Sequence, residues 1–308
     1  MPSQSRQSAP ASTSGTTTGA HPVEAVIVAG GFGTRMLPLT ANRPKHLLEV
    51  GGVPFLEHQI SRLAAAGVGH VVVATSYRAD LFEPVLGDGS RWGVRLEYVQ
   101  EAEPLGTAGA IRNVADALAD DPDGAVVILN GDVLSGHDLG AQLRDFDTLR
   151  DGRPVDVSLH LVEVADARAF GCVPTDAEGR VTGFTEKSEN PVTNQVNAGC
   201  YVFRRRVVDT IPAGRVVSVE RETFPALVAA DALVVGYVEN GYWRDVGSPE
   251  ALAAASRDLV LGVAPGHGPG TAADGDALVA PGAHVADSAE VADGSVLVAG
   301  ARVGAGAR

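Results

Sequence analysis

A glycine-rich run followed by cationic residues is the clearest chemical feature of the sequence. It reads Gly-Gly-Phe-Gly-Thr-Arg-Met-Leu-Pro-Leu-Thr over residues 30–40, and Pro44 and Lys45 follow. Glycines placed after a strand let backbone N–H groups approach phosphate oxygens, while Arg35 and Lys45 can neutralise negative charge. The run therefore predicts a loop that binds a triphosphate.

Two common nucleotide-binding loops do not fit the run. A dinucleotide-binding fold needs G-x-G-x-x-G at the start of a helix, and Met36 stands at the third glycine position. A nicotinamide-dependent dehydrogenase also needs an acid that binds ribose, and Glu49, near the required spacing, follows Pro44 and Lys45 in a different context. The Walker pattern is absent. A tight turn without a ligand is the plain alternative for such a loop.

The elements that must position this loop alternate between strand and helix patterns. Apolar runs predict strands at 23–29, 70–74, 95–100 and 125–130, and helical periodicity predicts helices at 55–66 and 107–119. This rhythm predicts an α/β fold with a doubly wound, mostly parallel sheet, of the Rossmann-like kind. Ligands bind beyond the carboxyl ends of such strands, where we expect Gly30, Gly31, Gln100 and Asp132.

The second half of the chain is richer in strands. We expect strands at 155–164, 181–186, 198–203 and 233–239, with a helix at 219–230, and we expect them to extend the same sheet. Domain boundaries follow from composition: a disordered tail at 1–22, one domain at 23–260, a linker at 261–276 and a repeat segment at 277–308.

The repeat segment has a period of six residues. Its apolar positions are Val279, Val285, Val291, Leu297 and Val303. A hexapeptide period is typical of a left-handed β-helix, although a tail rich in Ala, Val and Gly can show the same period by chance. Because the segment supplies little more than one coil, we expect it to dock on the main domain or on a partner, or to be cut short.

Composition excludes several classes of function. The 308 residues carry a net charge of −14, which argues against nucleic acids and anionic membranes as partners. No apolar run approaches the length of a membrane helix, and the first residues lack the apolar core of a secretory signal. Cys172 and Cys200 form no metal-binding or disulfide pattern, so we expect buried thiols in a reducing cytoplasm.

With Pro44 and Lys45 in place, the glycine-rich run resembles the signature of the nucleotide-sugar pyrophosphorylases, which are sugar-1-phosphate nucleotidyltransferases. Within that family the chain is most similar to bacterial mannose-1-phosphate guanylyltransferases of the actinobacterial type. The likeness extends from about Val23 to about Ser256. It implies that Arg35 holds the β- and γ-phosphates and that Lys45 grips the α-phosphate or the sugar phosphate; the nucleotide-binding positions are Gly30, Gly31, Gly33 and Thr34.

The resemblance also implies a base-binding segment. Gln100 and the run Pro-Leu-Gly-Thr-Ala-Gly at 104–109 match it, and the Leu-Gly-Thr-Ala-Gly version is similar to that of guanylyltransferases. A glutamine amide offers both a donor and an acceptor to a base, and Gly106 lets the base approach the backbone. Gly106 and Thr107 would also suit the cap of the helix that follows, and the two roles are compatible.

Asp132 and Asp245 match the two aspartates that bind the metal ion in the family. Mg²⁺ prefers few carboxylates together with phosphate oxygens and water, so two distant aspartates that converge on a triphosphate suit it. An Asp after a strand is otherwise commonly a helix cap or a turn residue.

The sugar-phosphate side of the cleft is carried by four matching positions. They are Gly171, Glu186, Lys187 and Asn197. Glu186 would accept hydrogen bonds from sugar hydroxyls, Lys187 would bind the sugar phosphate, and Asn197 would contact the hexose, although a Glu-Lys pair is also typical of a solvated surface. The chain departs from the family pattern at Met36, Leu37, His46 and Ser188, which bears on the identity of the sugar.

We therefore expect a Mg²⁺-dependent in-line displacement, in which a hexose 1-phosphate attacks the α-phosphorus of a nucleoside triphosphate and pyrophosphate leaves. GTP and mannose 1-phosphate, giving GDP-mannose, are the expected substrates. Other bases or acceptors, such as glucose, heptose or cyclitol phosphates, are the near alternative. A non-catalytic regulator that binds nucleotide sugar would be expected to lose the charged positions. A homo-oligomer fits the family.

Overall fold

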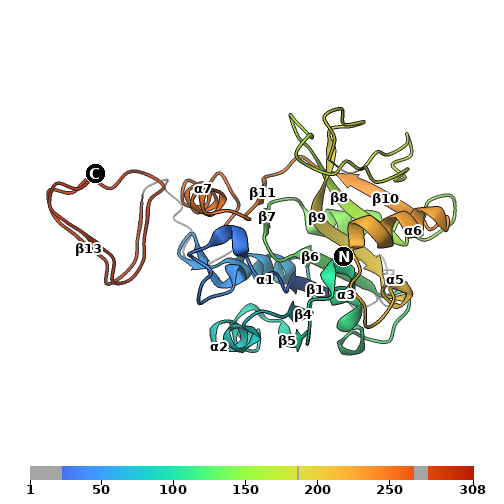
Figure 1. Ribbon diagram of the computed structural model, residues 1–308, viewed down its shortest axis with the longest axis horizontal. Coiled ribbons are helices and arrows are strands. Elements are labelled where there is room, and N and C mark those ends of the chain that lie inside the picture. The colour runs from blue at the N-terminus through green and yellow to red at the C-terminus, as the bar shows by residue number, and fades with distance from the viewer. Residues whose placement is uncertain (1–22, 186, 267–276) are drawn as a thin grey trace, which may run out of the picture.

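A seven-stranded sheet runs through the part of the chain that this computed structural model describes, residues 23–185, 187–266 and 277–308 (Figure 1). Its strand order is β10-β8-β9-β6-β1-β4-β5. The strands are β1 (Val23–Ala29), β4 (His70–Thr75), β5 (Arg95–Gln100), β6 (Ala125–Asn130), β8 (Val157–Glu163), β9 (Gln195–Arg204) and β10 (Val234–Val238). The expected tail at 1–22 and residues 267–276 of the expected linker lie outside the described residues.

Pairing within the sheet is mostly parallel, as the sequence predicts. β1 lies parallel to β4 and β6, and β4 lies parallel to β5. β9 runs antiparallel to both β6 and β8, and β10 is parallel to β8. The strands of the second half therefore extend the first sheet, which confirms that expectation.

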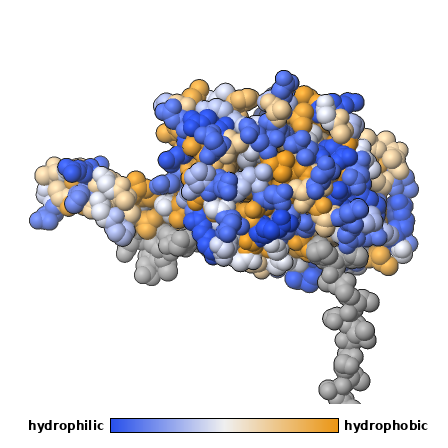
Figure 2. Space-filling model, turned by 90° about the horizontal axis from the view of Figure 1, so that it is seen from below, coloured by the Kyte–Doolittle hydropathy of each residue, from blue (hydrophilic) through white to orange (hydrophobic). Residues whose placement is uncertain are grey.

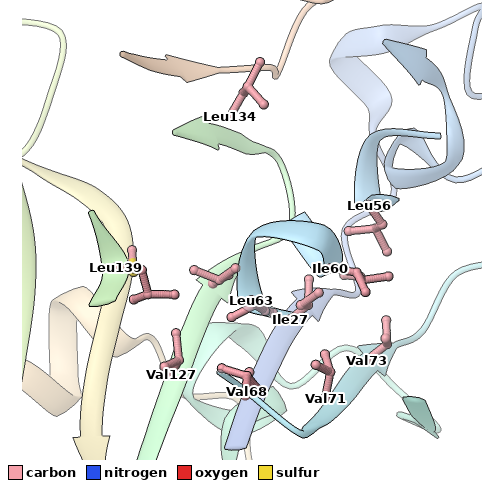
Figure 3. Close-up of a cluster of buried hydrophobic side chains, with 14 of the residues drawn as sticks. Ile27, Leu56, Ile60, Leu63, Val68, Val71, Val73, Val127, Leu134 and Leu139 are labelled. Carbon is pink, nitrogen blue, oxygen red and sulfur yellow. The ribbon is translucent and has the colours of Figure 1, made fainter. Parts of the chain in front are cut away.

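The central strands are apolar on both faces because each face of the sheet is covered. Along β1, Ala25 and Ile27 point into one hydrophobic cluster, while Val26 points into another. Figure 3 shows part of the first cluster, where Ile27 lies among side chains of β4, β6 and the helix that follows β3. A strand buried on both faces reads as a continuous apolar run, which is why the pattern predicted it.

Helices cover both faces. The first face carries α1 (Phe55–Ala65), α2 (Phe82–Leu86), α4 (Leu139–Phe146) and α7 (Pro249–Val260), and the second carries α3 (Gly106–Asn113), α5 (Arg205–Thr210) and α6 (Phe224–Ala229). In α1 the apolar face is formed by Leu56, Ile60 and Leu63 (Figure 3). The helix stops before Gly67, whose φ of 86° is one that glycine adopts without strain.

Short elements connect these layers. The single-turn helices are η1 (Thr34–Met36), η2 (Lys45–Leu47), η3 (Ala79–Leu81), η4 (Ser90–Trp92), η5 (Ala115–Ala117) and the π-helix η6 (Val219–Thr223). Two antiparallel ribbons pair β2 (Glu49–Val50) with β3 (Val53–Pro54) and β7 (Val133–Ser135) with β11 (Trp243–Asp245). The helix expected at 219–230 is thus η6 followed by α6, and the helix expected at 107–119 is α3 followed by η5.

The strand expected at 181–186 is wrong for the described residues, 181–185. Isolated bridges join Val181 to Thr175 and Thr185 to Cys172. Its backbone donors are divided, because Val181 N–H donates to Val234 while Thr185 N–H donates to Cys172. A segment that splits its hydrogen bonds between two neighbours forms no continuous ladder, although its apolar alternation is that of a strand.

The C-terminal segment projects from the main body (Figures 1 and 2). Its strands are β12 (Leu278–Val279), β13 (His284–Val285), β14 (Val296–Leu297) and β15 (Arg302–Val303). β12 pairs with β14 and β13 with β15, so each partner lies three six-residue repeats further along the chain. A Cβ on Gly52 would lie 2.7 Å from Leu278, so the segment contacts the β2–β3 turn. The left-handed β-helix itself stays a prediction.

The helices of the main body are short. Among the described residues, none of them is long and apolar enough to cross a bilayer.

Candidate active site

The carboxyl ends of the parallel strands gather the predicted residues at one edge of the sheet. The glycine loop follows β1, Gln100 ends β5, and Gly131 and Asp132 follow β6. Ligands of open α/β sheets bind at this edge. The placement at the strand ends is therefore the one that the sequence predicts.

The glycine loop packs closely on Lys45. Gly33 has a φ of 64°, and a Cβ there would lie 3.0 Å from Thr40 Cγ2 and 3.3 Å from Lys45 Cβ. Thr40 Oγ1 donates a 2.8 Å hydrogen bond to the Gly33 carbonyl, which holds the loop in this shape. Thr34 and Arg35 follow on η1, and both side chains are exposed. The glycine at position 33 is thus required by conformation and by space.

Lys45 and Asp132 form an ion pair at the centre of this edge. Nζ of Lys45 contacts Oδ2 of Asp132, and the two side chains are only 13% and 23% exposed. Burial would raise the pKa of the Asp132 carboxyl, but the positive charge and hydrogen bond of Lys45 outweigh burial and lower that pKa. Asp132 is therefore held ionised beside a cation.

The β7–β11 ribbon brings Asp245 to Asp132 from a distant part of the sequence. Asp245 pairs with Val133 across the ribbon, and Val246 N–H donates a 2.8 Å hydrogen bond to the Asp132 carbonyl. Burial raises the pKa of the Asp245 carboxyl, and the negative charge of Asp132 raises it further. The charges of Arg35, Lys45 and Lys187 oppose this shift. Two neighbouring carboxylates thus repel each other at this point.

Such a pair fits a hard divalent cation. In the described part of the chain, no three His, Cys, Asp or Glu side chains form a ready-made metal centre. Mg²⁺ needs only one or two carboxylates when phosphate oxygens and water complete its shell. The donor set of Asp132 and Asp245 therefore suits a cation that arrives with a polyphosphate.

Gln59 of α1 holds the loop that carries Asp132. Its Nε2 donates hydrogen bonds of 2.8 Å to the Asn130 carbonyl and 2.9 Å to the Val133 carbonyl, on either side of Asp132. The side chain is 4% exposed. Both amide hydrogens are therefore committed to the backbone of this loop.

A cavity of about 620 Å³ adjoins the two aspartates. The predicted residues that line it are Arg35, Asp132, Gly171, Lys187, Asn197 and Asp245. A Cβ on Gly247 would lie 2.8 Å from both Arg35 Nη2 and Asp245 Oδ1, so these two side chains approach one backbone position. The structure thus brings the charged residues of both halves of the chain into one site, of a size that suits a small ligand.

Three predicted base-binding residues, Gln100, Gly106 and Thr107, stand outside the residues that line this cavity. Gly106 has a φ of 72°, and a Cβ there would lie 2.7 Å from the Val217 carbonyl oxygen. Thr107 Oγ1 accepts a 2.9 Å hydrogen bond from Val219 N–H. α3 begins at Gly106, with Leu105 at the N-cap and no side-chain cap, so the capping interpretation is wrong. Glu186, a predicted sugar ligand, lies outside the described residues.

The sequence reasoning missed Glu101, which is buried next to the exposed Gln100. Its side chain is 4% exposed, and a Cβ on Gly30 would lie 3.2 Å from its Oε2. Oε1 has no hydrogen-bond partner among the described residues. Burial raises the pKa of this carboxyl, against a hydrogen bond from the Leu105 backbone. The available signal was an acidic residue directly after a strand, three positions before the Pro-Leu-Gly run.

Comparison with known proteins agrees with this geometry. A family profile described as "Nucleotidyl transferase" matches residues 24–260. The mannose-1-phosphate guanylyltransferase of Mycobacterium tuberculosis (strain ATCC 25618 / H37Rv) is 54% identical over 269 residues, which are 85% of this chain and 73% of the relative. Mannose-1-phosphate guanylyltransferase 1 of Arabidopsis thaliana is 36% identical over 243 residues, 78% of this chain and 64% of the relative.

Solved structures show the same fold. The HddC protein of Yersinia pseudotuberculosis complexed with GMP-PN has a TM-score of 0.63 at 26% identity, and the match covers 76% of this chain and 98% of that one. A putative glucose-1-phosphate thymidylyltransferase of Bacillus anthracis has a TM-score of 0.67 at 23% identity, over 76% of this chain and 94% of that one. Because the profile spans most of the sequence, and the charged residues of the site converge, the chain belongs to the nucleotidyl transferase family.

Proposed function

We propose that the chain joins GTP to mannose 1-phosphate and releases GDP-mannose and pyrophosphate. The observation that carries the proposal is the Lys45–Asp132 pair, with Asp245 beside it, at a cavity that Arg35 and Lys187 also line. The choice of base and sugar is supported by the names of the bacterial and plant relatives, which are guanylyltransferases of mannose 1-phosphate.

The reaction needs charge placed along a polyphosphate more than it needs a nucleophilic side chain. A phosphate oxygen of mannose 1-phosphate forms a bond to the α-phosphorus of GTP, and the bond from that phosphorus to the β-phosphate oxygen breaks. Lys45 stabilises the charge that develops at the α-phosphate. Arg35, with the backbone of Gly30, Gly31, Gly33 and Thr34, holds the leaving pyrophosphate, and Lys187 binds the phosphate of the sugar.

Asp132 and Asp245 would hold the metal ion. Members of the family generally use a divalent metal, and Mg²⁺ best suits two carboxylates beside phosphate oxygens. When bound, such an ion neutralises phosphate charge and fixes the orientation of the triphosphate. Asp132 would hold the ion while it pairs with Lys45, whose ammonium group is proposed to act on the reacting phosphate.

Guanine recognition is assigned to the segment that follows β5. Gln100, Gly106 and Thr107 are retained as base-binding residues, and Glu101 is added to them. Guanine presents two adjacent donors, N1–H and the N2 amino group, and a carboxylate accepts both. Uracil and thymine offer a single N–H between two carbonyl oxygens. These oxygens would repel a carboxylate, so the pairing is unfavourable. The position of Glu101 beside Gly30 supports a preference for GTP.

The sugar is assigned to one wall of the cavity itself. Gly171 and Asn197 line that wall together with Lys187, and Glu186 belongs to the same segment as Lys187.

We place the reaction in the cytoplasm, since Cys172 and Cys200 are buried free thiols. A homo-oligomer and a short β-helix at 277–308 complete the proposal.

Pyrophosphate release tests the proposal directly. The enzyme is mixed in turn with GTP, ATP, UTP or dTTP, and with mannose, glucose, heptose or cyclitol phosphates, in the presence of Mg²⁺. We expect the highest kcat/KM with GTP and mannose 1-phosphate. A higher value with another pair would assign the same chemistry to other substrates. Binding of GDP-mannose without turnover of any pair would identify a non-catalytic regulator and overturn the proposal.

A further inference from the structure

Glu220 is a carboxylate on the cavity wall for which the sequence motifs assign no role. It belongs to the π-helix η6 and lines the same cavity as Asp245 and Lys187. The start of η6 is fixed from outside, because Thr107 Oγ1 accepts a hydrogen bond from Val219 N–H. Single π turns often occur at functional sites, where they redirect a side chain.

Asn197, the residue expected to contact the hexose, already has most of its amide occupied. Its Nδ2 donates to the Tyr201 hydroxyl at 2.8 Å and to Glu220 Oε1 at 2.7 Å. Its Oδ1 accepts a 3.0 Å hydrogen bond from Gly199 N–H. A primary amide has two N–H donors, and both are used here. Asn197 therefore has no donor left for a sugar and only one acceptor position.

The orientation of this amide is fixed by its partners. The Glu220 carboxylate only accepts and the Gly199 N–H only donates, so Nδ2 must face Glu220 and Oδ1 must face Gly199. Tyr201 is fully buried, which anchors the other end of the chain of hydrogen bonds. Asn197 therefore binds one oxygen of the exposed Glu220 side chain where it lines the cavity.

Glu220 has the acceptor capacity that Asn197 lacks. An ionised carboxylate has about four acceptor positions, and Asn197 fills one of them. Asp132 and Asp245 are not available to the sugar in the same way, because Asp132 is paired with Lys45 and both are proposed to hold the metal ion. A hexose ring presents several hydroxyl donors, and hydrogen bonds from hydroxyls to a carboxylate are short and strong.

We propose that Glu220 accepts hydrogen bonds from hydroxyls of the hexose and so determines specificity for the sugar, and that Asn197 positions its carboxylate. This inference rests on the proposed function, because it names the group that reads the sugar at the same site. Glu220 is a specificity residue here, and it takes no part in the transfer of the nucleotidyl group.

The test compares Glu220→Gln with a matched control, Glu222→Gln. Glu222 lies on the same π-helix, but it accepts from Ser218 N–H and pairs with Arg215, and it is not among the cavity-lining residues described. We expect Glu220→Gln to raise the KM for mannose 1-phosphate by about tenfold or more and to leave the KM for GTP within about twofold. Glu222→Gln should change neither KM.

Deoxy substrates supply a readout that a structural role would not move. The 2-, 3-, 4- and 6-deoxy forms of mannose 1-phosphate are assayed with the wild type and with Glu220→Gln. For the hydroxyl that Glu220 binds, removal should lower kcat/KM in the wild type and have little further effect in the variant. Glu220→Asp, which keeps the charge, serves if the glutamine variant does not fold.

The outcomes separate the inference from the proposed function. Equal losses for every deoxy substrate in the wild type and in the variants would overturn the role of Glu220 and leave the proposed function standing. A wild type that releases no pyrophosphate from GTP and mannose 1-phosphate would overturn the proposed function, and this inference with it.

Discussion

Lys45 and Lys187 are the two lysines of the sequence, and both lie at the candidate site. All other members of the 24 Lys and Arg residues are arginines. Among the described residues, several arginines form surface ion pairs, such as Arg168 with Asp166 and Arg206 with Asp123. An ammonium group is a compact point charge, whereas a guanidinium group is a wide planar fork. A small cation fits between a carboxylate and a phosphate, so lysine at these positions is a chemical requirement of the proposed reaction.

Replacement of Lys45 tests this requirement at the site itself. We expect Lys45→Ala to lower kcat by about 10²–10³-fold, because it removes charge stabilisation at the reacting phosphate. Lys45→Arg should recover little of this loss, since the guanidinium group cannot enter the same space beside Asp132. Pyrophosphate release measures both variants, and thermal melting shows that they are folded. Full activity of Lys45→Arg would show that charge alone suffices.

The rarity of lysine also permits a labelling experiment on the unmodified protein. Pyridoxal phosphate followed by borohydride modifies amines, so Lys187, Lys45 and the α-amino group are the available targets. We expect Lys187 to react before Lys45, which is mostly buried in its ion pair. Mannose 1-phosphate should protect Lys187, and GTP with Mg²⁺ should protect Lys45. Peptide mass spectrometry measures each position, and labelling that neither substrate prevents would contradict the assignment.

Glu101 provides a test of base selection. We expect Glu101→Gln to lower kcat/KM for GTP by about tenfold or more, because the amide places a donor against the donors of guanine. The kcat/KM values for UTP and ATP should change less, so the ratio of kcat/KM for GTP to that for the other triphosphates should fall. Glu103→Gln is the matched control, since Glu103 is an exposed acid two positions further on. An unchanged ratio of GTP to UTP would exclude Glu101 as the base reader.

At the scale of elements, the ribbon and helix that surround Asp132 decide whether the site forms. β7 and β11 join Asp132 to Asp245, and α1 supplies Gln59. We expect Gln59→Leu to lower the free energy of unfolding by about 1–3 kcal/mol, because two partly buried carbonyls lose their donor. It should also raise the Mg²⁺ concentration needed for half-maximal activity.

Chemical denaturation and a Mg²⁺ titration measure the two effects of Gln59→Leu separately. A loss of stability with an unchanged Mg²⁺ requirement would show that Gln59 supports the fold without positioning Asp132. A raised Mg²⁺ requirement at unchanged KM for GTP would locate the effect at the aspartates.

The sequence predicted those elements whose signal is local. β1, β4 and β6 are apolar on both faces, and the glycine loop at Gly33 depends on one backbone conformation and on close neighbours. The strand predicted at 181–186 failed because alternation describes a side-chain pattern and does not show where backbone donors go. Its N–H groups at Val181 and Thr185 have different partners.

The remaining features of the site depend on contacts between distant segments. The ribbon that pairs Val133 with Asp245, and the bonds from Gln59 to the loop around Asp132, leave no periodic pattern in the sequence. The resemblance to a family supplied the two aspartates, whereas Glu101 and Glu220 emerged only from burial and hydrogen bonding in the structure. The roles proposed for Glu101 and Glu220 therefore depend on contacts that are visible in three dimensions alone.

At the scale of the whole molecule, the two ends of the parallel strands differ: one end carries the candidate site, and the other contains a buried polar cluster. The carboxyl ends of the parallel strands carry the site, with its repelling carboxylates and close-packed glycines. At the opposite end, where β1 and β4 begin, His70 Nδ1 lies 2.6 Å from Glu24 Oε1. Glu24 Oε2 also accepts a 2.8 Å hydrogen bond from Ala119 N–H. This buried polar cluster stabilises the sheet at the amino ends of β1 and β4, away from the end that carries the candidate site.

The cluster at Glu24 predicts a pH dependence of stability. Burial would raise the pKa of the Glu24 carboxyl, but the hydrogen bonds from His70 and Ala119 outweigh burial, and the folded pKa lies below the ordinary value of 4.5. A carboxyl with a lowered folded pKa adds stability above its unfolded pKa, and this stability is lost as the pH falls through the folded pKa. The contribution should therefore be complete at neutral pH and fade below about pH 4.5.

Urea denaturation of the wild type and of Glu24→Gln, from pH 7 down to pH 3, measures this contribution. At neutral pH we expect the variant to be less stable by about 1–3 kcal/mol, since the charged acceptor of two buried donors is lost. This difference in the free energy of unfolding should become smaller as the pH falls, because protonated Glu24 resembles glutamine. A difference in stability that does not change with pH would mean that the packing of the Glu24 side chain, and not its charge, stabilises this end of the sheet. The KM values should be unchanged at pH 7, because Glu24 lies at the end of β1 opposite the glycine loop.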